Sequence, residues 1–185
     1  LGPQAQATWP EAERRKAAAI AHLDASVGQL LRQLDDLRMA EQTVVVLTSD
    51  NAAQRDGLCN PAFFQSNGPF RGAKGELTEG GLRVPLLARW PGRIKPASTN
   101  DQPVALWDLF PTVVELAGVT NAPPTDGVSL VPALLGRPAK VRRDYLYWES
   151  HAGQFAQAIR AGDWKAIRPQ PDAPLELYQL ARDPG

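Results

Sequence analysis

The residues Thr43–Thr48 constrain the fold of this chain more than any other segment. They read Thr-Val-Val-Val-Leu-Thr, continuously apolar and β-branched in the middle, and the polar run Ser49-Asp50-Asn51 follows at once. This pattern is typical of a strand buried on both faces of a parallel sheet. Because such sheets occur mainly in α/β proteins, the sequence predicts that fold class.

A long amphipathic helix is predicted before this strand, from near Pro10 to Arg38. Its apolar residues recur at alternating steps of three and four, which places them on one face. They are Ile20, Leu23, Val27, Leu30, Leu34 and Leu37.

The rest of the chain alternates short predicted elements with loops. Strands are expected at 86–90 and 103–106, a helix from the cap Asp108 to Gly118, and a short helical segment near 130–135. Beyond Pro138, short strand-like segments at 145–148, 154–160 and 164–167 indicate a small antiparallel sheet. We therefore predict two domains, an α/β part over 1–140 and an incomplete small subdomain over 141–185.

Charge and composition exclude several classes of protein. Lys plus Arg and Asp plus Glu both total 20, so the formal charge is zero and general nucleic-acid binding is not expected. No apolar run approaches the roughly 20 residues that span a bilayer, so no transmembrane segment is predicted. The single cysteine excludes an internal disulfide and a cysteine-rich zinc site.

Two segments contain candidate functional residues. Asp50 and Asn51 follow the predicted strand, and the carboxyl ends of strands in open α/β sheets form the ligand crevice; the alternative is that both merely turn the chain. The segment 68–85 places Arg71, Lys74 and Arg83 among five glycines, which suggests an anion site. Its alternative is that these cations pair with Glu76 and Glu79 on the surface.

Four stretches of the chain resemble the sulfatase family, which is arylsulfatase-like and lies within the alkaline-phosphatase-like superfamily. The most specific has the spacing RG-x-K-G-x-x-x-EGG-x-RVP and lies within 66–94. The others are LDASVGQLLRQLDDL followed by TVVVLTSDN, PVALWDLFPTVVELAGV followed by DGVSLVPALLG, and AIRAGDWKAIRPQPDAPLELYQLARDPG. The resemblance implies part of a sheet sandwiched by helices, followed by a small C-terminal antiparallel subdomain.

The resemblance also implies a site with Ca²⁺, a formylglycine nucleophile made from Cys or Ser, and basic residues that bind sulfate. Residue by residue, Asp50 and Asn51 match the metal ligands and Lys74 matches the lysine that contacts the sulfate ester. His151 is a further candidate for a substrate contact; a surface histidine is the alternative. Ala52 stands where the family usually has Gly, which puts metal binding in doubt if that position needs a positive φ.

The family's C/S-x-P-x-R nucleophile motif is expected upstream of this chain. Cys59-Asn60-Pro61-Ala62-Phe63 offers C-x-P but lacks the arginine in fifth place, so we interpret Cys59 as an ordinary loop cysteine.

The sequence therefore predicts the C-terminal portion of a sulfuric ester hydrolase that is inactive by itself. Its substrate would be an aryl sulfate or a sulfated carbohydrate. The alternatives are a non-catalytic or degenerate module that binds sulfated glycans, and a phosphoryl or phosphonate ester hydrolase of the same superfamily. The oligomeric state is left open, and only the family resemblance suggests a periplasmic or secreted location.

Overall fold

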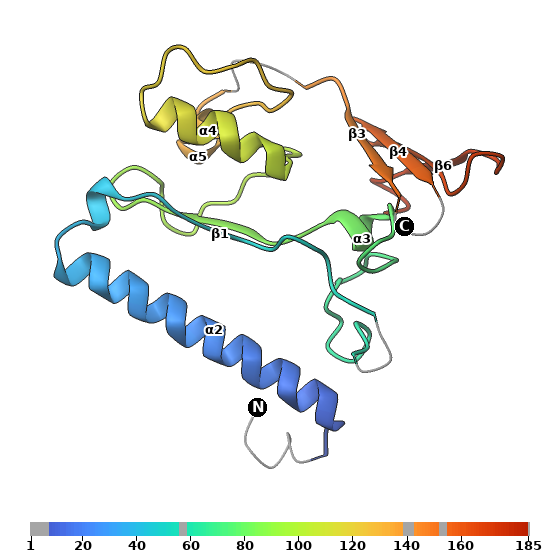
Figure 1. Cartoon of the computed structure of the whole chain (residues 1–185), viewed down its shortest axis with the longest axis horizontal. Coiled ribbons are helices and arrows are strands. Elements are labelled where there is room, and N and C mark those ends of the chain that lie inside the picture. The colour runs from blue at the N-terminus through green and yellow to red at the C-terminus, as the bar shows by residue number, and fades with distance from the viewer. Residues whose placement is uncertain (1–7, 56–58, 139–142, 152–154, 185) are drawn as a thin grey trace. The chain divides into compact units, whose positions relative to one another are not determined.

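The computed structural model describes residues 8–55, 59–138, 143–151 and 155–184 (Figure 1). The chain divides into two compact units. Unit 1 comprises 1–33, 48–86 and 144–185, and unit 2 comprises 34–47 and 87–143. The structure is a mixed α/β arrangement, and the domain boundary expected near residue 140 stays a prediction.

The predicted N-terminal helix is confirmed. Helix α2 runs without interruption over Glu11–Asp36 (Figure 1). Near its start, the Glu11 carboxylate pairs with Arg14 and with Arg15 three and four residues on, spacings that bring side chains together on a helix. Several side chains of the predicted apolar stripe are exposed, among them Ile20, Leu23, Leu30 and Leu37. None of the helices in the described ranges is long and apolar enough to cross a membrane.

The strand that follows Asp36 is shorter and more exposed than expected. A 3₁₀ turn, η1 (Ala40–Gln42), leads into strand β1 (Val45–Thr48), which pairs with strand β2 (Leu86–Arg89) in a two-stranded sheet. The expected burial on both faces is not found in the described residues. Val46 and Leu47 are exposed, because β1 has β2 as its single strand neighbour there.

The remaining elements of unit 2 are short helices. A 3₁₀ turn, η2 (Leu106–Asp108), leads directly into helix α4 (Leu109–Leu116), and helix α5 (Val131–Leu134) follows. The helix predicted after Asp108 is thus confirmed. The strand predicted at 103–106 is wrong, because the amide of Ala105 is bound by the Asp108 carboxylate and the chain turns at Leu106.

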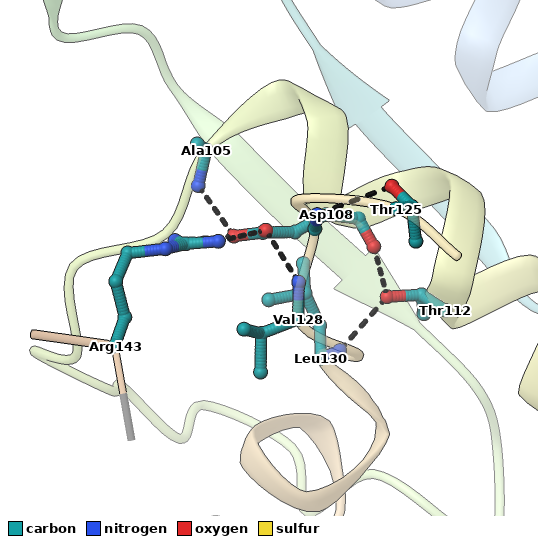
Figure 2. A network of polar contacts seen from close by, with 8 residues as sticks. Ala105, Asp108, Thr112, Thr125, Val128, Leu130 and Arg143 are labelled. Carbon is teal, nitrogen blue, oxygen red and sulfur yellow. Dashed lines mark hydrogen bonds and ion pairs between the residues drawn. The ribbon is translucent and has the colours of Figure 1, made fainter. Parts of the chain in front are cut away.

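Asp108 lies at the centre of a network of polar contacts in unit 2 (Figure 2). The sequence predicts that its side chain caps helix α4, but no such cap hydrogen bond is formed. The carboxylate is 0% exposed and accepts hydrogen bonds from the amides of Ala105 at 2.8 Å and Val128 at 2.9 Å. The Arg143 guanidinium contacts both of its oxygens. Thr112 donates its hydroxyl hydrogen to the Asp108 carbonyl at 2.6 Å and accepts from the Leu130 amide at 2.8 Å. One buried carboxylate therefore joins three separate stretches of the chain.

The small antiparallel sheet predicted at the C-terminus is confirmed in unit 1. Its order is β3-β4-β5-β6, and every neighbouring pair is antiparallel. The strands are β3 (Leu146–Ser150), β4 (Ala156–Ala161), β5 (Trp164–Arg168) and β6 (Glu176–Gln179).

The apolar core of unit 1 joins this sheet to the glycine-rich segment. Leu77, which precedes the short helix α3 (Glu79–Leu82), is buried with Ala158 of β4 and Ile167 of β5. Trp148 and Tyr178 pack against this cluster. The glycine-rich segment is therefore part of the folded core at its C-terminal end.

The Asp108 network predicts a strong effect of one isosteric substitution. Asp108→Asn should lower the free energy of unfolding by about 3–5 kcal/mol, because it leaves the Arg143 guanidinium without a charged partner in a buried site. Urea denaturation of the chain measures the effect. Asp101→Asn, at an exposed position, is the control and should change the same quantity by less than about 0.5 kcal/mol. Equal losses in the two variants would contradict this view of the network.

Candidate functional site

Asp50 and Asn51 lie in the bend that follows β1, and both are exposed. Ser49 donates its hydroxyl hydrogen to the Asn51 carbonyl at 2.8 Å, which closes the bend. Ala52 does not have a positive φ, so the alanine at this position causes no backbone strain.

Lys74 lies on the glycine-rich loop of residues 70–76, and its side chain is exposed. No ion pair joins it to any residue in the described part of the chain. Its backbone amide donates to the carbonyl of Ala53 at 2.9 Å, while the neighbouring Ala73 is buried. The loop that carries Lys74 is thus hydrogen-bonded to the segment that begins with Asp50 and Asn51.

The donor chemistry of this region fits a hard cation. A carboxylate and a side-chain amide oxygen, adjacent in sequence and exposed, are the oxygen ligands that Ca²⁺ prefers. The described residues contain no group of three or more His, Cys, Asp or Glu side chains that holds a metal. Asp50 and Asn51 are therefore suited to be part of a Ca²⁺ site, and further ligands would have to come from elsewhere.

His151 and Cys59 are the other two residues that the sequence singled out. The His151 side chain is 77% exposed, its Nε2 is 4.0 Å from a Glu149 oxygen, and its ring lies 4.9 Å from that of Phe155. In the described part of the chain, no contact joins it to Asp50, Asn51 or Lys74. Cys59 is half-buried in the loop after β1.

An ion cluster lies beside the glycine-rich loop. The alternative left open for the cations of this segment was pairing with Glu76 and Glu79 on the surface; Arg83 does pair with Glu79, but the Glu79 side chain is only 4% exposed. The sequence did not single out Lys165 as a further partner of Glu79. One carboxylate oxygen accepts from Lys165 Nζ at 2.8 Å, and the other accepts from Arg83 Nε at 2.7 Å and lies 3.8 Å from Arg160. A single buried carboxylate therefore faces three cations.

The register of the sheet explains why a carboxylate is needed at this place. Lys165 of β5 lies directly opposite Arg160 of β4, and like charges in that position repel each other. The Glu79 carboxylate contacts both and offsets the repulsion. Lys165 also shares its strand face with the core residue Ile167 two positions on, so the alternation of strand side chains was a usable signal in the sequence.

The charges of this cluster change the acidity of Glu79. Burial by itself raises the pKa of a carboxyl group, but the hydrogen bonds and charges of Lys165 and Arg83 outweigh it. The pKa of Glu79 is consequently lowered from its ordinary value of 4.5. The carboxylate thus stays ionised at neutral pH and pairs with the cations around it.

Comparison with known families and proteins gives consistent matches over the whole chain. The family profile described as Sulfatase matches residues 3–119, and the profile described as N-sulphoglucosamine sulphohydrolase, C-terminal, matches residues 73–185. Among curated proteins, steryl-sulfatase of Mus musculus is 36% identical in an alignment 202 positions long, which covers 90% of this chain and 32% of that protein. The chain thus spans about a third of the length of that protein, and it spans 27% of steryl-sulfatase of Rattus norvegicus, to which it is 40% identical.

Solved structures give the same picture. Ps i-CgsB in complex with k-i-k-neocarrahexaose has a TM-score of 0.79 and 26% identity, over 98% of this chain and 40% of that one. BT4656 in complex with its substrate D-glucosamine-2-N,6-O-disulfate has a TM-score of 0.69 and 27% identity, over 92% of this chain and 34% of that one.

The lowered pKa of Glu79 predicts how acid affects stability. The stabilisation from ionised Glu79 should be complete above pH 4.5 and should be lost as the pH falls through the lower pKa of the folded state. Glu79→Gln should therefore melt at a lower temperature than the wild type at neutral pH, and the difference should shrink as the pH falls below 4.5 and through the lowered pKa of the folded state.

Thermal denaturation at several pH values checks this. Glu76→Gln, at an exposed position of the same loop whose carboxylate lies 3.8 Å from Arg55, is the control and should keep the pH dependence of the wild type. A difference between Glu79→Gln and the wild type that does not change with pH would contradict the prediction.

Proposed function

Because the chain belongs to the sulfatase family, we propose that it is the C-terminal part of a sulfuric ester hydrolase in which Lys74 binds the sulfate group and Asp50 and Asn51 bind Ca²⁺. The observation that carries the proposal is the hydrogen bond from the Lys74 amide to the Ala53 carbonyl. It joins the backbone of Lys74, whose side chain is exposed, to the segment that begins with the two oxygen donors. The whole polypeptide is called the parent protein below.

The roles follow from the chemistry of the side chains. Lys74 forms no ion pair with the residues that the structure describes, so its positive charge is available for a sulfate oxygen. A preorganised cation stabilises the charge that develops when an ester bond breaks. Asp50 and Asn51 would hold Ca²⁺ by a carboxylate and an amide oxygen. The bound ion would supply additional positive charge for the sulfate group.

The nucleophile is assigned to a preceding part of the parent protein. The motif C/S-x-P-x-R does not occur in the 185 residues, and Cys59 lacks the arginine that the motif requires. We therefore assign binding and charge stabilisation to this chain and the formylglycine nucleophile of the family to another region. The domain division at residue 140 belongs to the same proposal.

The substrate class is a sulfate ester, either on a sugar or on an aryl or steryl alcohol. BT4656 was solved with a disulfated glucosamine as its substrate, and a steryl-sulfatase is among the similar curated proteins, which supports both kinds of alcohol. His151 is proposed as a contact to the alcohol portion, since its exposed ring is not engaged in the core.

A second candidate is a non-catalytic module that binds sulfated glycans. The two candidates differ in the parent protein, because an enzyme needs the motif upstream and a binding module does not.

The chain alone should not hydrolyse sulfate esters, because the covalent step has no nucleophile. We expect no release of 4-nitrophenol from 4-nitrophenyl sulfate with Ca²⁺ present, beyond that of a Lys74→Ala control. Turnover above the control would defeat the assignment of the nucleophile to another region. The parent protein should be active in the same assay; if it carries the motif and is inactive, the binding module is the better proposal.

Substitutions in the parent protein should separate the roles of the three residues. Asp50→Ala should weaken Ca²⁺ binding and lower activity by orders of magnitude, with partial recovery in excess Ca²⁺, and Asn51→Ala should act likewise but more mildly. Lys74→Ala should lower kcat/KM by about 10²–10³ and leave Ca²⁺ affinity nearly unchanged.

Calorimetric titration of Ca²⁺ together with steady-state kinetics tests this assignment. Lys95→Ala, at another exposed lysine, is the matched control and should resemble the wild type in both measurements. If Lys74→Ala loses the metal, or Asp50→Ala binds it as well as the parent does, the assignment is wrong.

A further inference from the structure

We propose that Lys165 is a positioning residue: through Glu79 and helix α3, it holds in place the glycine-rich loop that carries Lys74. The functional importance of this role rests on the proposed sulfate-binding role of Lys74. The contacts that link Lys165 to the loop do not depend on it.

The first link is the buried pair of Lys165 and Glu79. Lys165 Nζ donates to the Glu79 carboxylate at 2.8 Å, and the two side chains are 1% and 4% exposed. The ammonium also lies 5.5 Å from the centre of the Trp148 ring. A buried ion pair with good geometry becomes costly when one partner is removed, so this contact ties the start of α3 firmly to β5.

The other two cations near Glu79 are less suited to this role. The Arg83 side chain is 45% exposed and belongs to the residue directly after α3, so it cannot tie α3 to the sheet. Arg160 lies 3.8 Å from the carboxylate and donates its Nε hydrogen to the Gly162 carbonyl. Of the three, Lys165 alone combines burial, hydrogen-bond distance and a place in the sheet.

The second link joins α3 to the loop through two glycines. The Gly80 amide donates to the Arg71 carbonyl at 2.8 Å, and a Cβ at Gly80 would lie 2.5 Å from that oxygen. A Cβ at Gly81 would lie 2.1 Å from the Glu76 carbonyl oxygen and 2.7 Å from that of Ala73. The backbone on both sides of Lys74 is therefore in close contact with α3, so a shift of α3 would displace that backbone.

The third link is the hydrogen bond from the Lys74 amide to Ala53, which connects the loop to the segment after Asp50 and Asn51. A further anchor joins the loop to the sheet, because Arg71 donates to the Tyr178 hydroxyl at 2.6 Å. Contacts thus lead from Lys165 through Glu79, Gly80 and Gly81 to the backbone of Ala73 and Glu76, on either side of Lys74.

Amide hydrogen exchange in the parent protein tests the structural part of the inference. In Lys165→Met, the amides of Gly80 and Lys74 should exchange at least about tenfold faster than in the wild type, whereas helix α4 in unit 2 should be unchanged. Arg168→Met, which removes an exposed cation from the same strand, is the matched control and should leave both amides as in the wild type. Unchanged exchange in Lys165→Met, or equal acceleration in Arg168→Met, would overturn the inference.

A double-mutant cycle tests whether Lys165 acts through Lys74. With 4-nitrophenyl sulfate as substrate, Lys165→Met should lower kcat/KM of the parent protein, and adding Lys165→Met to Lys74→Ala should lower it no further. Fully additive losses would overturn the inference, because they would mean that Lys165 acts independently of Lys74. If Lys165→Met does not fold, Lys165→Gln, which keeps a shorter hydrogen-bond donor, replaces it in both experiments.

The two experiments also separate this inference from the proposed function. If the parent protein hydrolyses no sulfate ester, the proposed function fails, while hydrogen exchange still decides whether Lys165 holds the loop. If Lys74→Ala impairs an active parent protein and Lys165→Met changes neither exchange nor kcat/KM, the proposed function stands and the positioning role is wrong.

Discussion

The buried ion pair of Glu79 and Lys165 is the interaction on which the candidate site depends. It places a carboxylate from the glycine-rich segment against two cations that lie opposite each other in the C-terminal sheet. Without that carboxylate, the sheet would bury like charges side by side, which is costly in a low-dielectric interior. The same pair fixes α3, and α3 supports the loop with Lys74.

Unit 2 uses a buried carboxylate in a comparable way. The Asp108 carboxylate accepts hydrogen bonds from two backbone amides and from both terminal nitrogens of the Arg143 guanidinium. It thereby joins segments that are 35 residues apart in the chain. In both units a buried acidic side chain contacts segments that are far apart in the sequence. Substitution of such an acid is expected to lower the stability of the fold strongly, because removing one partner leaves the other charge buried and unpaired.

The candidate site combines a firmly held backbone with exposed side chains. Ala73 and Glu79 are buried, whereas Lys74, Asp50 and Asn51 are exposed. Within the described part of the chain, no ion pair engages Lys74 or Asp50. This division suits a binding site, since the scaffold limits the motion of the loop and leaves its charged groups free for a ligand. Membership of the sulfatase family makes a sulfate ester the natural candidate for that ligand.

The sequence by itself determined the local elements and the family. Helix α2 and helix α4 follow from the spacing of their apolar residues and from Gly118 as a stop, and strands β3, β4 and β5 follow from short strand-like segments between turns; all of these signals are local. The motif around Lys74 identified the family, and the sequence also placed Lys74, Asp50 and Asn51 as site candidates. Only the tertiary structure decided that 103–106 is not a strand, that Glu79 is buried, and that Lys165, 86 residues later, is its partner. The physical reason is that a charge is buried only where a distant segment supplies its counter-charge, and no local pattern specifies which segment that is.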